Sequence, residues 1–334
     1  MGLLSRAVVA AVAVISTLAL AACSAPASTT ASASASTAAT AAGTWPKTVT
    51  HDAGTTEIPA APLRIVSTSP SITGSLLAID APLVGSGAAT VTALTDDKGF
   101  FKQWASVADQ RGVEVVYANL TMDLDAIESF RPDLIIGSSN GGDSSLESYA
   151  QLSEIAPTIL LNYGTMTWQQ LTTELGSILG RDAAATSVIA EYDAWVAEQA
   201  KAITVPEQPV TVLVYLGADG VWAYTSDTPQ AKLLESVGFQ YADAKAEFST
   251  TTPGAGTSVV SAENMPAALA GAQSLFVVPI SGDAAVTAFA SDALVSTLPA
   301  VTGNRVFNLG SQSFRLDYYS AKATVESLRQ QFGA

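Results

Sequence analysis

Cationic and aromatic side chains occur together at three places where the sequence predicts loops or strand ends. Lys102 and Trp104 share one segment, and Trp222 and Tyr224 close a predicted strand. Arg315 comes just before the last predicted helix. Because the chain has only 15 Lys plus Arg, cations beside aromatic rings favour an anionic, aromatic ligand bound by charge and stacking. Taken one at a time, each residue is more simply explained as a core aromatic, or as a cation that is solvated or paired with a nearby acid.

One segment matches an enzyme signature. Residues 137–141, Gly-Ser-Ser-Asn-Gly, fit the nucleophile-elbow pattern and would make Ser139 the nucleophile of a serine hydrolase. Such an enzyme needs a histidine base, but the only histidine, His51, lies far upstream in a predicted strand, where we expect it to be exposed. We therefore interpret residues 137–142 as a Gly/Ser loop at the carboxyl end of a strand, the ligand-facing position in open α/β sheets. A surface hydrolase that uses Ser139 is the remote alternative.

Signatures of cofactor, metal and nucleic-acid sites are missing from the sequence. There is no Gly-Lys-Ser/Thr phosphate loop, and no Gly-rich dinucleotide fingerprint follows the first strand. One histidine and one cysteine cannot assemble a three-histidine or multi-cysteine metal site. The net charge of −15 argues against nucleic acid, which needs clustered basic residues to replace its counterions. We therefore expect a protein that is not an enzyme and has no cofactor and no metal ligands of its own.

The N-terminus has the pattern of an exported bacterial lipoprotein. Residues 1–6 carry one positive charge, residues 7–19 are almost wholly apolar, and Leu-Ala-Ala precedes Cys23. Such a run is too short to span a membrane as a helix but is typical of a signal peptide. We predict that residues 1–22 are a lipoprotein signal peptide and that Cys23 carries the lipid. Two acyl chains, at about 0.8 kcal/mol per buried methylene, would hold the protein on the extracytoplasmic face of the cell membrane.

The chain after Cys23 divides into a tether and an α/β region. Residues 23–44 are nearly all Ala, Ser and Thr, too poor in apolar surface to fold, so we predict a flexible tether. From Trp45 onward, short β-rich runs alternate with helical patterns, which predicts parallel α/β sheets. We expect an N-terminal α/β lobe over 45–181, an interlobe helix over 182–204 that is long enough at about 1.5 Å per residue to reach from one lobe to the other, and a C-terminal α/β lobe over 205–334.

The individual elements follow from the hydrophobic pattern and from the Gly and Pro residues between them. A hairpin is expected at 48–58. Further strands are expected at 63–67, 83–87, 114–117, 133–138, 158–163, 210–215, 221–225, 275–279 and 305–309. Helices are expected at 70–80, 123–130, 145–155, 168–179, 182–203, 228–237, 261–270, 284–296 and 317–332.

Several segments, in order along nearly the whole mature chain, carry a family resemblance. They lie at 65–69, 73–82, 96–100, 103–104, 141–144 and 155–158, and the most specific is Phe-Arg-Leu-Asp-Tyr-Tyr-Ser-Ala at 314–321. Together they resemble the family of periplasmic ferric-enterobactin (catecholate siderophore) substrate-binding proteins of ABC importers. The resemblance implies two Rossmann-like lobes bridged by a single long helix, the siderophore/vitamin B12-type fold. It also implies capture of a ferric siderophore, with iron held by the siderophore, for delivery to an ABC importer permease by a monomeric protein.

The resemblance also implies roles for particular residues. Arg315 and Lys102 would neutralise a catecholate ligand, and Trp222 or Tyr224 would stack on its rings, with the choice between these two left open. Trp104 and Tyr318 complete the expected ligand site. One acidic residue on each lobe would meet arginines of the permease, and the matching segments give these as Asp125 and Glu263.

Two departures from the family pattern bear on the ligand and the location. The lipobox and tether contrast with a soluble periplasmic relative. Residues 91–95, Val-Thr-Ala-Leu-Thr, carry no cation where the relative would have an arginine, which weakens selection for a triply charged catecholate. A hydroxamate siderophore, haem or a corrinoid is therefore the alternative ligand, and a scaffold without a transport role also stays open.

Overall fold

The computed structural model describes residues 43–251 and 256–333, and residues 41–334 form one compact unit. Cys23, the predicted signal peptide and all but the end of the predicted tether lie outside the described residues. Within the described ranges no helix is long and apolar enough to cross a membrane.

The N-terminal lobe is built on a five-stranded parallel sheet with the strand order β5-β4-β3-β6-β7. Every residue of β3, β6 and β7 is buried, as expected for parallel strands that are covered on both faces. A separate antiparallel hairpin, β1 and β2, lies beside β7. The strands are β1 Lys47–His51, β2 Gly54–Ile58, β3 Ile65–Ser67, β4 Leu83–Gly87, β5 Glu114–Tyr117, β6 Leu134–Ser138 and β7 Thr158–Leu161.

The helices of this lobe begin and end on recognisable local signals. Pro70 stands at the first position of α1, where a missing N–H costs nothing. Thr167 and Gln170 form a capping box at the start of α5, and Gly180 ends that helix in the left-handed conformation with φ 65°. The helices are α1 Pro70–Ala78, α2 Lys102–Gln110, α3 Leu124–Ser129, α4 Tyr149–Ile155 preceded by the short η1 Leu146–Ser148, and α5 Trp168–Leu179.

The C-terminal lobe has a six-stranded sheet with the order β10-β11-β9-β8-β12-β13. Only β8, β12 and β13 run parallel, whereas β9 and β11 pair antiparallel, so the expectation of a purely parallel sheet is wrong here. Five residues join β8 to β9, too few for the crossover that a parallel pair needs. The strands are β8 Val210–Tyr215, β9 Val221–Tyr224, β10 Thr250–Thr251, β11 Thr257–Val260, β12 Ser274–Val277 and β13 Val306–Asn308.

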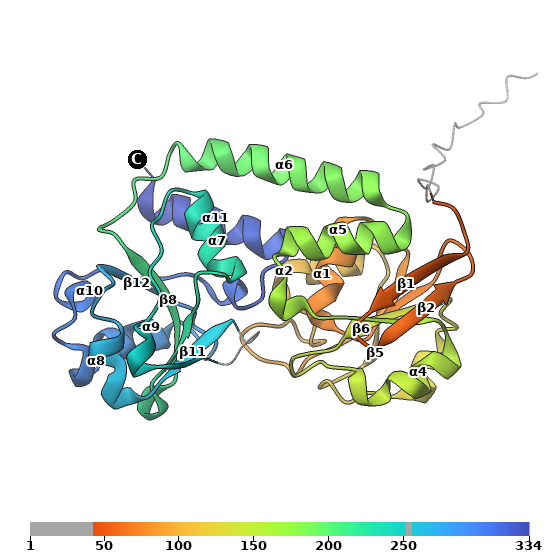
Figure 1. Ribbon diagram of the computed structural model, residues 1–334, viewed down its shortest axis with the longest axis horizontal. Coiled ribbons are helices and arrows are strands. Elements are labelled where there is room, and N and C mark those ends of the chain that lie inside the picture. The colour runs from red at the N-terminus through yellow and green to blue at the C-terminus, as the bar shows by residue number, and fades with distance from the viewer. Residues whose placement is uncertain (1–42, 252–255, 334) are drawn as a thin grey trace, which may run out of the picture. The chain divides into compact units, whose positions relative to one another are not determined.

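One long helix, α6 Asp182–Ala200, runs past both lobes (Figure 1). It packs against α5 of the N-terminal lobe and against α7 and α11 of the C-terminal lobe. Its 19 residues span about 28 Å at 1.5 Å per residue. The helices that cover the second sheet are α7 Pro229–Ser236, α8 Met265–Ala268, α9 Ala284–Ala290, α10 Pro299–Thr302 and α11 Tyr318–Phe332. This arrangement is the predicted class, two α/β lobes bridged by a single helix.

Several local features differ from the sequence prediction, among them α10, which was not expected, and the two described next. Lys102 and Trp104, expected to lie in a loop, belong to α2, whose first turn has no side-chain cap at Phe101. Trp104, Ala105 and Ala108 are its buried positions, so the helix depends on tertiary packing more than on a strong sequence signal. Strands β10 and β11 were also not predicted, since Thr and Ser around Gly256 resemble a loop.

Candidate functional site

A pocket of about 240 Å³ is lined by side chains from both lobes. The N-terminal lobe contributes Ser71 from the start of α1, Tyr163 after β7 and Trp168 from α5. The C-terminal lobe contributes Trp222 and Tyr224 from β9, and Arg315 from the segment between β13 and α11 lines the pocket too. Three of the six residues predicted for the ligand site therefore meet in one cavity, as ligand sites between lobes commonly do.

Arg315 places a cation over aromatic rings at this pocket. Its guanidinium lies 4.3 Å from the ring centroid of Phe314 and 5.5 Å from that of Tyr163, which belongs to the other lobe. Within the described ranges no ion pair joins Arg315 to a carboxylate. The guanidinium is half-buried against aromatic faces, and its Nη1 donates to the Phe314 carbonyl at 3.4 Å, a long contact that leaves further N–H donors for an anionic ligand.

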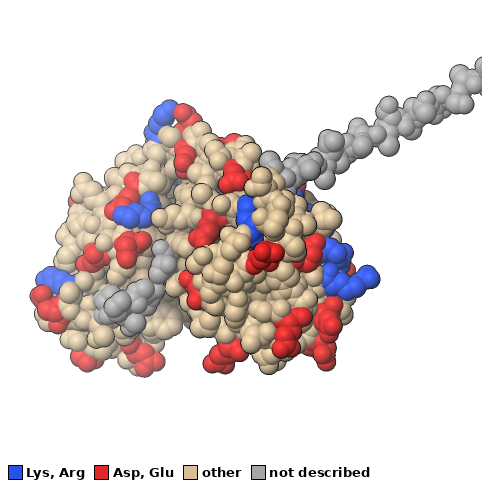
Figure 2. Space-filling model, turned by 45° about the vertical axis from the view of Figure 1, so that its right-hand side comes forward, with Lys and Arg blue, Asp and Glu red and all other residues tan. Residues whose placement is uncertain are grey.

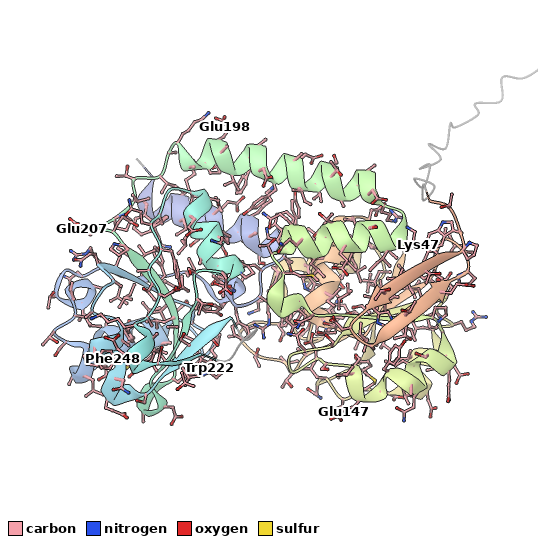
Figure 3. The ribbon with its side chains drawn as sticks, viewed as in Figure 1. Lys47, Glu147, Glu198, Glu207, Trp222 and Phe248 are labelled. Carbon is pink, nitrogen blue, oxygen red and sulfur yellow. The ribbon has the colours of Figure 1, made fainter. Side chains whose placement is uncertain are left out.

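Trp222 and Tyr224 reach the pocket from one face of β9 because alternate residues of a strand point the same way. Trp222 is 37% exposed and Tyr224 is 5% exposed, so the indole presents more surface to a ligand. Figure 3 labels Trp222 beside β11, on the side of the C-terminal lobe turned toward the N-terminal lobe. Burial raises the pKa of Tyr224 to about 12, so its hydroxyl stays protonated at neutral pH.

Behind the pocket wall, Asp143 fixes two of the lining segments of the N-terminal lobe. One carboxylate oxygen accepts the Tyr163 hydroxyl at 2.8 Å. The other accepts the Ser69 hydroxyl at 2.5 Å and the Ser71 amide at 3.2 Å. Burial, followed by the nearby Asp143 charge, raises the pKa of Tyr163 to about 12. Tyr163 is therefore held as a donor to Asp143 with its ring turned to Arg315.

The other three predicted ligand residues lie elsewhere. The Lys102 ammonium, at the start of α2, is exposed and donates to the carbonyl of Ala93 at 2.9 Å. Trp104 is fully buried in the core of the N-terminal lobe, 5.0 Å from the ring of Phe100. Tyr318 packs edge-on against Trp168 at 5.8 Å between centroids. None of the three lines the pocket, so the structure does not place them in contact with a ligand there.

Sequence reasoning missed the residues that the N-terminal lobe contributes to this pocket. In the sequence pattern, Tyr163 ends a predicted strand, Trp168 opens a predicted helix, and Ser71 belongs to the start of another helix, so none of the three is marked as a pocket residue. The usable signal was their place after parallel strands, since loops at the carboxyl ends of such strands form ligand sites.

The two predicted permease-contact acids are on the surface. Asp125 is exposed in the first turn of α3, and Glu263 is exposed in the short η5 Ala262–Asn264. Hydrogen bonds from its own backbone amide and from the Ser261 side chain lower the pKa of Glu263. Figure 2 shows acidic side chains spread over the face in view, with fewer basic ones.

The geometry around Ser139 does not make a catalytic pair. Its hydroxyl donates to Asp52 at 2.6 Å. Both ring nitrogens of His51 are engaged elsewhere: Nε2 lies 3.0 Å from the Thr56 hydroxyl, and Nδ1 accepts the amides of Ala53 and Leu160. His51 is half-buried, not exposed as expected, and burial lowers its pKa. Within residues 43–251 and 256–333, no group of three His, Cys, Asp or Glu could hold a metal ion.

A family model and two known proteins match the chain, and all three are described as binding proteins. The family model described as periplasmic binding protein matches residues 65–313. The chain is 40% identical, over 297 residues, to the ferric enterobactin-binding periplasmic protein FepB of Escherichia coli O6:H1 (strain CFT073), covering 87% of this chain and 92% of that protein. It is 29% identical over 206 residues to the probable siderophore-binding lipoprotein YfiY of Bacillus subtilis (strain 168), covering 60% of this chain and 59% of that protein.

Solved structures share the fold. Holo-ViuP superposes with a TM-score of 0.80 at 30% identity, covering 87% of this chain and 97% of that one. Staphylococcus aureus SirA complexed with staphyloferrin B gives 0.67 at 22% identity, covering 85% of this chain and 98% of that one. The second likeness bears on the fold alone.

Proposed function

Because the chain belongs to the periplasmic binding protein family, we propose that it captures a ferric siderophore outside the cytoplasm and delivers it to an ABC importer. The relative with 40% identity is named as a ferric enterobactin-binding protein, which supports a ligand with at least one catecholate ring. Binding and release need no covalent step, in keeping with a family of substrate-binding proteins that are not enzymes.

The observation that carries this proposal is the position of Arg315. It is a cation without a carboxylate partner in the described ranges, and it lines a pocket that also contains five aromatic side chains. Catecholate oxygens are anionic and the catechol ring is flat, so charge and stacking act on the same ligand. Trp222 is the better stacking residue of the two, because its ring is more exposed than the buried ring of Tyr224.

Replacing Arg315 tests the proposal. Arg315→Ala should weaken binding of ferric enterobactin at least tenfold, because a charge-assisted hydrogen bond contributes about 1.5–3 kcal/mol. Quenching of tryptophan fluorescence during titration measures the affinity. Lys102→Ala is the matched control, since that cation does not line the pocket, and its affinity should change less than about twofold. Equal losses in both variants, or no quenching of the parent protein by any ferric siderophore, would contradict the assignment.

We also propose that Asp125 and Glu263 meet basic residues of the permease, as their exposure on separate lobes allows. Reversing both charges, Asp125→Lys with Glu263→Lys, should leave ligand affinity unchanged, because neither residue lines the pocket. Uptake of radioactive iron by cells should fall at least tenfold, since like charges across a contact repel. Reversal of the exposed Glu128 and Glu247 is the control. Normal uptake in the first variant would rule out this docking role.

We propose, finally, that the protein is anchored by lipid on Cys23. The chain carries the lipobox pattern, and the relative YfiY is named as a lipoprotein.

A further inference from the structure

The pocket contains little positive charge. The structure describes nearly every Lys and Arg of the chain, so the cations that line the pocket can be identified. Of the 15 Lys plus Arg, only Arg6 falls outside the described residues. Among the rest, Arg315 alone lines the pocket. A ligand bound there meets one full positive charge from the protein.

Cations of the N-terminal lobe that do not line the pocket have partners of their own. Lys102 donates to the carbonyl of Ala93 at 2.9 Å, and Lys98 pairs with Asp109. Arg181 donates to the carbonyl of Ile79 at 3.3 Å. Each would have to leave these contacts, and move, before it could neutralise a charge in the pocket.

A negative charge lies behind Tyr163 and Ser71, two lining residues of the N-terminal lobe. Asp143 is 8% exposed, and no cation pairs with it within the described ranges. Its three hydrogen bonds all come from neutral donors, two of which belong to the lining residues Ser71 and Tyr163. The protein therefore offers one positive charge from the C-terminal lobe and one negative charge just behind the N-terminal wall.

We propose that the preferred ligand is a mixed-donor ferric siderophore, in which hydroxamate groups replace one or two of the three catecholates. This proposal rests on the proposed function and narrows its ligand. Each replacement removes one negative charge from the iron complex. Arg315 neutralises a larger share of the charge on a complex with one or two negative charges than on a trianion. The remaining catechol ring can still stack on Trp222.

The energetic argument is that uncompensated charge is costly to remove from water. A tris-catecholate would bring three negative charges to one guanidinium and would also face Asp143 in a partly dry cavity. A neutral tris-hydroxamate would avoid that cost, but it would leave Arg315 without an anion and the aromatic wall without a ring. The mixed complex meets both requirements.

The test compares the affinities of the full mature chain for three ferric complexes. Fluorescence titration would use ferric enterobactin, a synthetic ferric complex with one catecholate and two hydroxamates, and ferrichrome as the neutral tris-hydroxamate. We expect the mixed complex to bind at least tenfold more tightly than either of the others. A trianion that binds as tightly as the mixed complex would overturn the inference while leaving the proposed function intact. No binding of any complex would instead remove the proposed function.

Two charge variants show whether charge, and not ligand shape, sets the ranking. Asp143→Asn keeps the size of the side chain and should improve binding of the trianion relative to the mixed complex several-fold. Thr257→Arg adds a cation on β11, where Thr257 lines the pocket opposite Tyr224, and should act in the same direction even if Asp143→Asn folds poorly. Ala288→Arg adds the same charge on the exposed side of α9 as a control. If Thr257→Arg and Ala288→Arg shift the ranking equally or not at all, charge in the pocket does not select the ligand.

Discussion

Asp317 is a buried carboxylate at the junction between the lobes. It caps α11, accepting the Ser320 amide at 2.9 Å, and it is only 4% exposed. Its second oxygen has a long contact, 3.5 Å, with the Gln103 amide of α2. Burial, partly offset by the hydrogen bonds from Ser320 and Gln103, raises the pKa of Asp317 to about 6. The ionised form is therefore less stable in this position than in the unfolded chain.

Asp317→Asn should make stability less dependent on pH. The native carboxyl binds a proton more tightly than the unfolded one, so its contribution to stability is full below about pH 4 and is lost as pH rises to about 6. The variant keeps a capping group and should be more stable than the parent at pH 7 by about 2–3 kcal/mol. At pH 4 the difference should nearly vanish. Urea unfolding at both pH values measures it, and a difference that does not change with pH would contradict the assignment.

At the residue scale, three of the residues predicted from the sequence for the ligand site line one pocket. Arg315, Trp222 and Tyr224 stood out as cations or rings at loop and strand ends, and they share the pocket. The same rule selected Trp104, whose ring lies in the core. Whether a Trp faces a cavity or a core depends on which helix packs over it, and the spacing of residues does not contain that information.

At the element scale, short buried strands and capped helices were predictable because their signals are local. The limits of β4 and β5 and of α5 agree with the predicted ranges to the residue. The antiparallel direction of β9 could have been predicted from the five-residue connection with Gly217 and Gly220, both of which have positive φ. The existence of α2 could not, since its stability comes from burying Trp104 against neighbouring helices.

Gly74 allows three of these helices to meet. A Cβ added there would lie 2.7 Å from Cγ of Asp317, the N-cap of α11, and 2.9 Å from Cδ1 of Trp104 in α2. Gly74→Ala should therefore force these side chains apart and lower the free energy of unfolding by about 1–3 kcal/mol. Urea or thermal unfolding checks this.

The adjacent residue of α1 supplies the control for that variant. Ser75→Ala removes a fully buried hydroxyl that has no hydrogen-bond partner among residues 43–251 and 256–333, and it adds no atoms. Its unfolding free energy should be unchanged or higher. If Gly74→Ala is as stable as Ser75→Ala, the contact between α1, α2 and α11 can accommodate a methyl group, and the predicted clash is wrong.

For the whole molecule, two α/β lobes and one connecting helix followed from the alternation of strand and helix patterns and from a long helical stretch without Gly or Pro. The position of the pocket could not be predicted from these sequence patterns. It depends on contacts between distant segments, such as the α1–α11 and α2–α11 packing and the approach of Arg315 to Tyr163. Those contacts set how the lobes meet, and they join residues more than a hundred positions apart.

The proposed lipid on Cys23 concerns how the binding protein stays near its importer. In a cell without an outer membrane, a soluble binding protein would diffuse away, whereas an anchor keeps the pocket at a high effective concentration beside the permease. Cys23→Ala should therefore bind a ferric siderophore with unchanged affinity, because the pocket lies within residues 71–316. It should be shed into the medium, and iron uptake should fall at low siderophore concentration. Fractionation with immunoblotting measures the first effect and radioactive iron uptake the second. Retention on the membrane with normal uptake would show that something other than this cysteine holds the protein in place.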